Sequence, residues 1–187
     1  MNCGWNCEIV LVCTNVLCGV KTGCCFNLDP LVKSLGNIVF DPKKMRCVVW
    51  RHRQISCGKP VALVFESGYI SVNGNSTVSQ ACRNTRQFMR ILQKHHGYKI
   101  YKPVISIQAI SATCKIPKNY KLKMQAIVEC FDANYEPEIM QACVLKKAGI
   151  TYIIFPSGSI VITGMKNTYS SLENVCDTIT EILILCS

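Results

Sequence analysis

Side chains that could perform catalysis are few and scattered in this chain of 187 residues. None of its three histidines, His52, His95 and His96, has the spacing of a metal-binding helix or of a nucleophile–histidine pair. Six cysteines near the N-terminus lack the paired C-x2-C spacing of structural zinc sites: Cys3, Cys7, Cys13, Cys18, Cys24 and Cys25. Because cysteine is among the most buried residue types, we interpret these thiols as small core side chains. The sequence therefore predicts a protein that is not an enzyme and has neither cofactor nor metal.

The basic side chains are more informative. Lys and Arg number 21 against 11 acidic residues, and the resulting net charge of +10 favours a polyanionic partner such as nucleic acid or a membrane surface. No apolar run approaches the roughly 18 residues that would cross a bilayer. The start of the chain also lacks the basic and apolar regions of a signal peptide, so we expect an intracellular protein with reduced thiols and no membrane.

Two segments of the chain occur twice. The segment Phe65–Gly74 returns as Phe155–Gly164 at an offset of 90, and Phe40–Met45 is echoed by Tyr135–Met140 at an offset of 95. Two echoes in the same order at nearly one spacing indicate an internal repeat. We expect an N-terminal extension over residues 1–13, a first repeat over 14–97 and a second repeat over 98–187.

Each repeat predicts a hairpin followed by a long helix. The Phe-x-Ser-Gly-x-Ile pattern is typical of two strands joined by a tight turn, since Ser-Gly supplies the positive φ that a hairpin needs. An apolar stripe at helical spacing predicts a helix from about Thr77 to His95, formed by Val78, Ala81, Cys82, Thr85, Phe88, Met89 and Leu92. A second stripe predicts a helix capped by Ser170 or Ser171, formed by Leu172, Val175, Cys176, Ile179, Ile182 and Leu183.

The strands are apolar on both faces. Val61, Leu63 and Phe65 alternate with two further apolar residues, and residues 150–155 are similarly apolar. An antiparallel strand usually has one polar face that meets water. With one long helix per repeat, helices can cover only one face, so the other is an exposed apolar patch or a binding surface. The sequence thus favours a partner that is both anionic and flat.

Several motifs in order resemble the TATA-binding protein family, from about Thr14 to Leu183. They are Thr14-Asn15-Val16-Leu17, Asp41-Pro42-Lys43-Lys44-Met45, Tyr135-Glu136-Pro137-Glu138, and the two Phe-x-Ser-Gly turns. The resemblance implies an α+β fold, a two-repeat saddle made of a curved antiparallel sheet with helices on its convex face. It also implies that the concave face binds the DNA minor groove, where architectural proteins insert apolar wedges between base steps.

The resemblance assigns DNA-contacting roles residue by residue. The four wedge positions fall on Met45, Phe65, Met140 and Phe155, and the two Met residues predict a less sharp kink. The paired central asparagines fall on Asn15 and Ala109; because Ala109 cannot donate a hydrogen bond, we expect weaker discrimination near the centre. The remaining implied contacts are Leu17, Leu63, Ser71, Asn73, Ser111, Ile153, Val161 and Thr163, with Arg51 and Lys146 as phosphate ligands. A packing role for the two Met residues, a structural role for Asn15 and plain solvation of the two cations remain alternatives.

The resemblance also implies protein partners. Tyr135, Glu136, Glu138 and Ile139 correspond to the loop that receives a TFIIB-type factor, whereas Lys43 and Lys44 occupy the equivalent loop of the first repeat. The basic helix with Arg83, Arg86 and Arg90 corresponds to a contact for other factors, such as a TFIIA-type factor, or for upstream DNA.

These observations predict a general initiation factor that binds and bends A·T-rich promoter DNA and recruits RNA polymerase, in the nucleus or at a cytoplasmic viral replication site. The alternative is an adaptor that has lost autonomous TATA binding. Ala109, Met45 and Met140 favour that alternative, while the apolar hairpins and the positive charge favour DNA.

Overall fold

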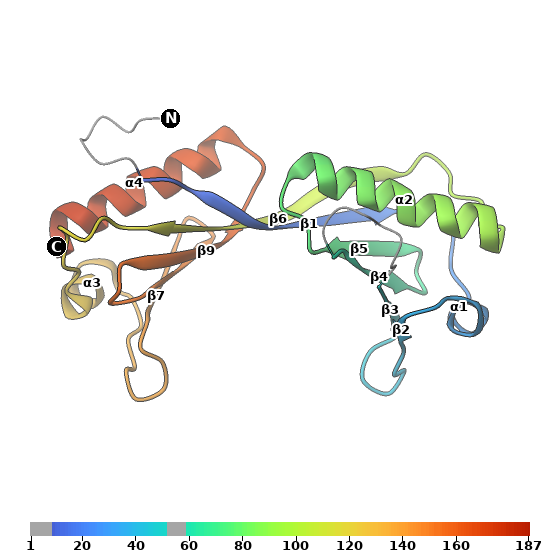
Figure 1. The fold of residues 1–187 in the computed structure, drawn as a ribbon, viewed down its shortest axis with the longest axis horizontal. Coiled ribbons are helices and arrows are strands. Elements are labelled where there is room, and N and C mark those ends of the chain that lie inside the picture. Colours follow the sequence, from blue (N-terminus) through green and yellow to red (C-terminus); the bar gives the residue numbers. More distant parts are fainter. Residues whose placement is uncertain (1–8, 52–58) are drawn as a thin grey trace. The chain divides into compact units, whose positions relative to one another are not determined.

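A computed structural model describes residues 9–51 and 59–187 (Figure 1). Cys3, Cys7 and His52 lie outside the described residues. The chain forms two compact units. We call Asn15–Gln108 the N-terminal unit, and Ala109–Ser187, together with residues 9–14, the C-terminal unit.

The N-terminal unit is an antiparallel sheet with two helices. Its strands have the order β2-β3-β4-β5-β1. Their bounds are β1 (Val12–Lys21, which enters this unit at Asn15), β2 (Ile38–Val39), β3 (Cys47–Arg51), β4 (Val61–Phe65) and β5 (Tyr69–Asn73). The helices are α1 (Leu28–Ser34) and α2 (Val78–His96).

The C-terminal unit has strands in the order β6-β9-β8-β7. Their bounds are β6 (Val104–Lys115, which enters this unit at Ala109), β9 (Ser159–Met165), β8 (Ile150–Ile154) and β7 (Cys143–Lys147), and the helices are α3 (Met124–Phe131) and α4 (Tyr169–Cys186). Apart from the short β2, elements follow one another in the same order as in the N-terminal unit: one strand, a short helix, three strands and a long helix. The predicted α+β class with antiparallel strands is therefore confirmed.

Glycine closes both predicted hairpins. Gly68 and Gly158 have φ of 83° and 79°, and their N–H groups donate to the carbonyls of Phe65 and Phe155 at 3.0 and 2.9 Å. A β-carbon at Gly68 would lie 1.8 Å from the Cys24 carbonyl oxygen, so both the backbone conformation and the space require glycine there.

One face of each sheet packs against the long helix of its unit. In the N-terminal unit, Trp50 of β3 meets Phe88 of α2 edge-on, with ring centroids 4.9 Å apart. On this side the hairpin strands contribute fully buried residues: Ala62, Val64, Ile70 and Val72 under α2, and Tyr152, Ile154, Ile160 and Ile162 under α4. Alternate residues of each strand thus form a dry core with the helix.

Both long helices form, with two corrections to the prediction for α4. Its N-cap is Thr168, whose hydroxyl accepts from the Ser171 N–H at 3.3 Å, while the Ser171 hydroxyl accepts from the Lys166 N–H at 3.0 Å. A serine cap was therefore wrong, because Ser171 lies inside the first turn. Leu172 is 43% exposed and not part of the buried stripe.

The prediction that the N-terminal cysteines are buried core side chains is confirmed for only some of them. Of the described N-terminal cysteines, Cys18 is buried, Cys13 and Cys24 are half-buried, and Cys25 is exposed.

Among the described residues, no helix is both long and apolar enough for a membrane span.

Candidate nucleic-acid interface

Opposite α2, the N-terminal unit has a second sheet face whose side chains remain mostly half-buried. Alternation along the strands places a mixed apolar and polar set here, which we call the N-terminal open face: Asn15, Leu17, Gly19, Val49, Arg51, Val61, Leu63, Phe65, Tyr69, Ser71 and Asn73. Strand pairing aligns these residues in rows across the sheet. Leu63, for example, lies between Val49 and Ser71 of the neighbouring strands. The apolar face predicted from the strand pattern is therefore present.

The C-terminal unit has an equivalent face. We call the following residues the C-terminal open face: Ser111, Thr113, Val144, Lys146, Thr151, Ile153, Phe155, Ser159, Val161 and Thr163. Ile153 lies between Val144 and Val161, as Leu63 does between Val49 and Ser71. All the sheet residues that the sequence predicted as DNA contacts lie on one of these two faces.

A polar pair lies at the β1–β5 edge of the N-terminal open face. The Asn15 side chain donates from Nδ2 to Asn73 Oδ1 at 3.3 Å, and its Oδ1 accepts from the Gly74 N–H at 2.9 Å. These contacts fix the amide, and an amide nitrogen carries two hydrogens, so one remains available to an acceptor outside the protein.

The C-terminal unit has a different polar pair. Ser111 Oγ donates to Thr163 Oγ1 at 3.3 Å, whereas Ala109 is half-buried and its methyl group has no polar atom. The two open faces therefore have different hydrogen-bonding capacity at equivalent strands.

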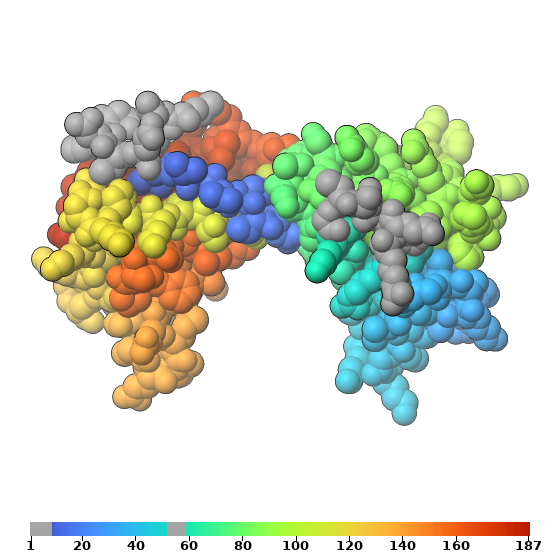
Figure 2. All heavy atoms as spheres, in the orientation of Figure 1, coloured from blue at the N-terminus to red at the C-terminus, as the bar shows by residue number. Residues whose placement is uncertain are grey.

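The loops with the two predicted methionine wedges have the same backbone hydrogen bonds. In the first, Met45 N–H donates to the Asp41 carbonyl at 2.9 Å; in the second, Met140 N–H donates to the Glu136 carbonyl at 2.9 Å. Figure 2 shows each loop projecting from its own unit. Met45 and Met140 are 45% and 40% exposed, so much of each side chain remains available to a partner.

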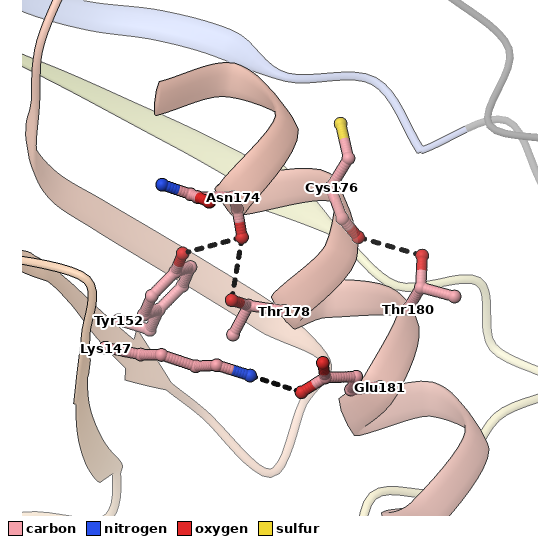
Figure 3. A network of polar contacts seen from close by, with 7 residues as sticks. All are labelled: Lys147, Tyr152, Asn174, Cys176, Thr178, Thr180 and Glu181. Carbon is pink, nitrogen blue, oxygen red and sulfur yellow. Dashed lines mark hydrogen bonds and ion pairs between the residues drawn. The ribbon is translucent and has the colours of Figure 1, made fainter. Parts of the chain in front are cut away.

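Strand register sorts two neighbouring lysines onto opposite faces. Lys147 forms an ion pair with Glu181 of α4 (Figure 3). Its ammonium nitrogen also lies 5.6 Å from the Phe131 ring centroid. Lys146 therefore projects from the other side of β7, where it is exposed and pairs with Thr151. Arg51 has the equivalent place in the N-terminal unit, exposed and paired with Val61.

The predicted partner-binding residues are at the surface. In the second loop, Glu136, Glu138 and Ile139 are exposed, Ile139 by 81%, while Tyr135 packs partly against the C-terminal core. On α2, Arg83, Arg86 and Arg90 are exposed and line shallow surface grooves that share Cys82.

The sequence interpretation missed some residues of the open faces. Tyr69 and Thr151 share the alternation that located Leu63 and Ile153, and this signal could have found them. Gly19 could not have been found, because its role depends on a contact with Tyr69 that is distant in sequence.

Each of the two units has the same order of elements, with a long helix on one sheet face and an opposite, half-buried face that this helix does not cover. These features define a two-repeat α+β binding protein. The family model described as "Transcription factor TFIID (or TATA-binding protein, TBP)" matches residues 10–95 and 104–185. The chain belongs to the TATA-binding protein family, and it is a TBP-like transcription factor.

Individual relatives agree with this family. The chain is 33% identical over 157 residues to TATA-box-binding protein-like 1 of Entamoeba histolytica, covering 83% of this chain and 71% of the relative. It is 29% identical over 178 residues to TATA-box-binding protein 1 of Triticum aestivum, covering 92% and 75%. Its fold matches that of Methanococcus jannaschii TBP with a TM-score of 0.77 and 24% identity, over 93% of this chain and 98% of that one.

Proposed function

We propose that this protein is an initiation factor that binds A·T-rich promoter DNA through the minor groove and bends it, each open face contacting one half of the site. The observation that carries the proposal is a pair of equivalent sheet faces that are apolar, uncovered by the long helices and each bordered by an exposed cation, Arg51 or Lys146. An apolar surface suits the floor and sugar walls of the groove, and a cation at its edge suits phosphate.

Selectivity in this proposal comes from few hydrogen bonds. A·T and T·A pairs present the same minor-groove acceptors, and only G·C adds an amino donor. Asn15 can donate to such acceptors, whereas Ala109 cannot, so discrimination is stronger in the half of the site that meets the N-terminal open face. Flexible TA steps cost least to deform, and the proposed wedges Met45, Phe65, Met140 and Phe155 would enter there.

The proposed partners follow from charge. Glu136 and Glu138 form an exposed acidic tip in a protein of net charge +10, which favours a basic surface on a TFIIB-type factor. Arg83, Arg86 and Arg90 favour an acidic surface, as on a TFIIA-type factor. RNA polymerase would join through these factors. The proposed organisation remains two repeats, 14–97 and 98–187, after the short extension 1–13, and the proposed place of action is the nucleus.

Ala109 supports a second candidate, an adaptor without autonomous DNA binding. Electrophoretic mobility shifts on A·T-rich and G·C-rich duplexes, over a salt series and with or without a TFIIB-type factor, distinguish the two. The proposal expects a shifted A·T-rich duplex whose affinity falls steeply with salt, because phosphate contacts release counterions. No shift under any condition would leave only the adaptor.

A further inference from the structure

Tyr69 adds an aromatic ring to the N-terminal open face. It is the first residue of β5, directly after the hairpin, and its ring centroid lies 6.0 Å from that of Phe65 with the planes tilted by 46°. This separation is within the range of interacting aromatic pairs. Phe65 and Tyr69 thus present two neighbouring rings on one face.

The place of the Tyr69 ring depends on Gly19 of β1. A β-carbon at Gly19 would lie 1.9 Å from the Tyr69 hydroxyl oxygen and 2.8 Å from the Cζ atom. The ring therefore lies over the β1 backbone in space that any other residue would fill. Among residues 9–51 and 59–187, no hydrogen bond uses the Tyr69 hydroxyl. Burial, and secondarily the nearby Cys18 thiol, raises the pKa of Tyr69, so the hydroxyl remains a donor at neutral pH.

The C-terminal unit lacks this arrangement. Ser159 pairs with Lys115 as Tyr69 pairs with Lys21, so Ser159 holds the equivalent place. Thr113 pairs with Val161 as Gly19 pairs with Ser71, so this unit has a β-branched residue where the N-terminal unit has a glycine. The second aromatic ring, and the glycine that makes room for it, belong to one unit only.

We propose that Tyr69 is a specificity-determining residue of the N-terminal open face, which reads A·T pairs in one half of the DNA site. Its ring extends the apolar surface beside Phe65, and its hydroxyl donates to adenine N3 or thymine O2. A guanine amino group projects from the groove floor beside these acceptors and obstructs this bond, and the hydroxyl can accept from the amino group only by giving up its own donation to N3 or O2. This inference rests on the proposed DNA-binding function.

The test compares Tyr69→Phe with the wild-type protein by fluorescence anisotropy on three sets of duplexes. Each base pair of an A·T-rich site is replaced in turn by inosine·cytosine, which has no minor-groove amino group, or by guanine·cytosine. The variant keeps the ring and loses the donor. We expect it to bind the A·T-rich site about fivefold more weakly, the typical value of one hydrogen bond. We also expect a reduced inosine-to-guanine affinity ratio at one or two adjacent positions.

Two further variants distinguish the loss of a specific Tyr69 contact from a general effect of substitution on folding. Tyr152→Phe removes a phenolic hydroxyl on the helix-covered side of the other unit, where it donates to the Asn174 carbonyl at 3.4 Å, and should leave affinity and the inosine-to-guanine ratio unchanged. Gly19→Ala should displace the ring and weaken binding at least as much as Tyr69→Phe, with thermal unfolding and circular dichroism recorded for each protein. If the wild-type protein binds DNA and Tyr69→Phe has the same affinity and the same ratios, the inference is wrong and the proposed function survives. If the wild-type protein binds no duplex, both are wrong.

Discussion

Removing both phenylalanines from the open faces tests the wedge assignment directly. Phe65 and Phe155 are each the residue before a hairpin turn, and each is half-buried in the free protein. In the double variant Phe65→Ala plus Phe155→Ala, both units keep their helix-covered cores, because the buried residues of β4 and β8 point the other way. We therefore expect a folded protein with impaired DNA bending.

The size of the effect follows from the area that remains to be buried. Complete burial of a phenylalanine side chain stabilises by about 1.5–3 kcal/mol. Since well over half of each ring is already covered, insertion between bases would add about 0.7 kcal/mol per ring, or about 1.5 kcal/mol for the pair. This predicts roughly tenfold weaker binding to an A·T-rich duplex.

Bending is measured by energy transfer between dyes at the two ends of the duplex, at protein concentrations that saturate each variant. Phe131→Ala is a matched control. Phe131 is a half-buried ring at the end of α3, where it contacts Lys147, and it is not part of the C-terminal open face. This substitution should lower the melting temperature and leave bending intact. Wild-type bending by the double variant at saturation would refute the wedge assignment.

Three other predictions test separate parts of the proposal. Lys146→Ala should reduce the slope of log affinity against log salt by about one with little change in stability, whereas Lys147→Ala should reduce stability and leave the slope unchanged, measured by anisotropy and thermal unfolding. Glu136→Lys plus Glu138→Lys should weaken the contact with a TFIIB-type factor in a supershift assay without weakening binary DNA binding; a defect confined to DNA binding would mean that this loop was misassigned. Burial, and secondarily His95, lowers the pKa of His96, so the unfolded state binds more protons and stability should fall as pH drops through the unfolded pKa near 6.5. His96→Gln should flatten that dependence in denaturant titrations, and an unchanged profile would contradict it.

Local chemistry predicted much of the fold. The hairpins followed from Ser-Gly turns whose glycines need positive φ, and α2 followed from its apolar stripe, with Thr77 and Gly97 at its ends. The open faces followed from strands that are apolar on both sides while each repeat has one long helix.

Other features depend on tertiary register. Lys146 and Lys147 are identical neighbours in sequence, and only the strand pairing shows which one meets Glu181. Tyr69 and Gly19 are 50 positions apart, so their fit needs the β1–β5 pairing. The cap of α4 was misplaced because several consecutive residues can cap a helix, and the geometry at Thr168 decides.

The two projecting loops share the same main-chain hydrogen bonds, to which side chains add local contacts: the Asp41 carboxylate accepts from the Lys43 N–H at 3.2 Å, and Glu136 accepts from the Asn134 amide at 3.4 Å. One tip carries Lys43 and Lys44 and the other Glu136 and Glu138. In such a duplicated fold, single substitutions can change the charge of one loop tip at a time without disturbing the hydrophobic core. New protein–protein pairings could thus evolve at either tip while the nucleic-acid surface stays as it was.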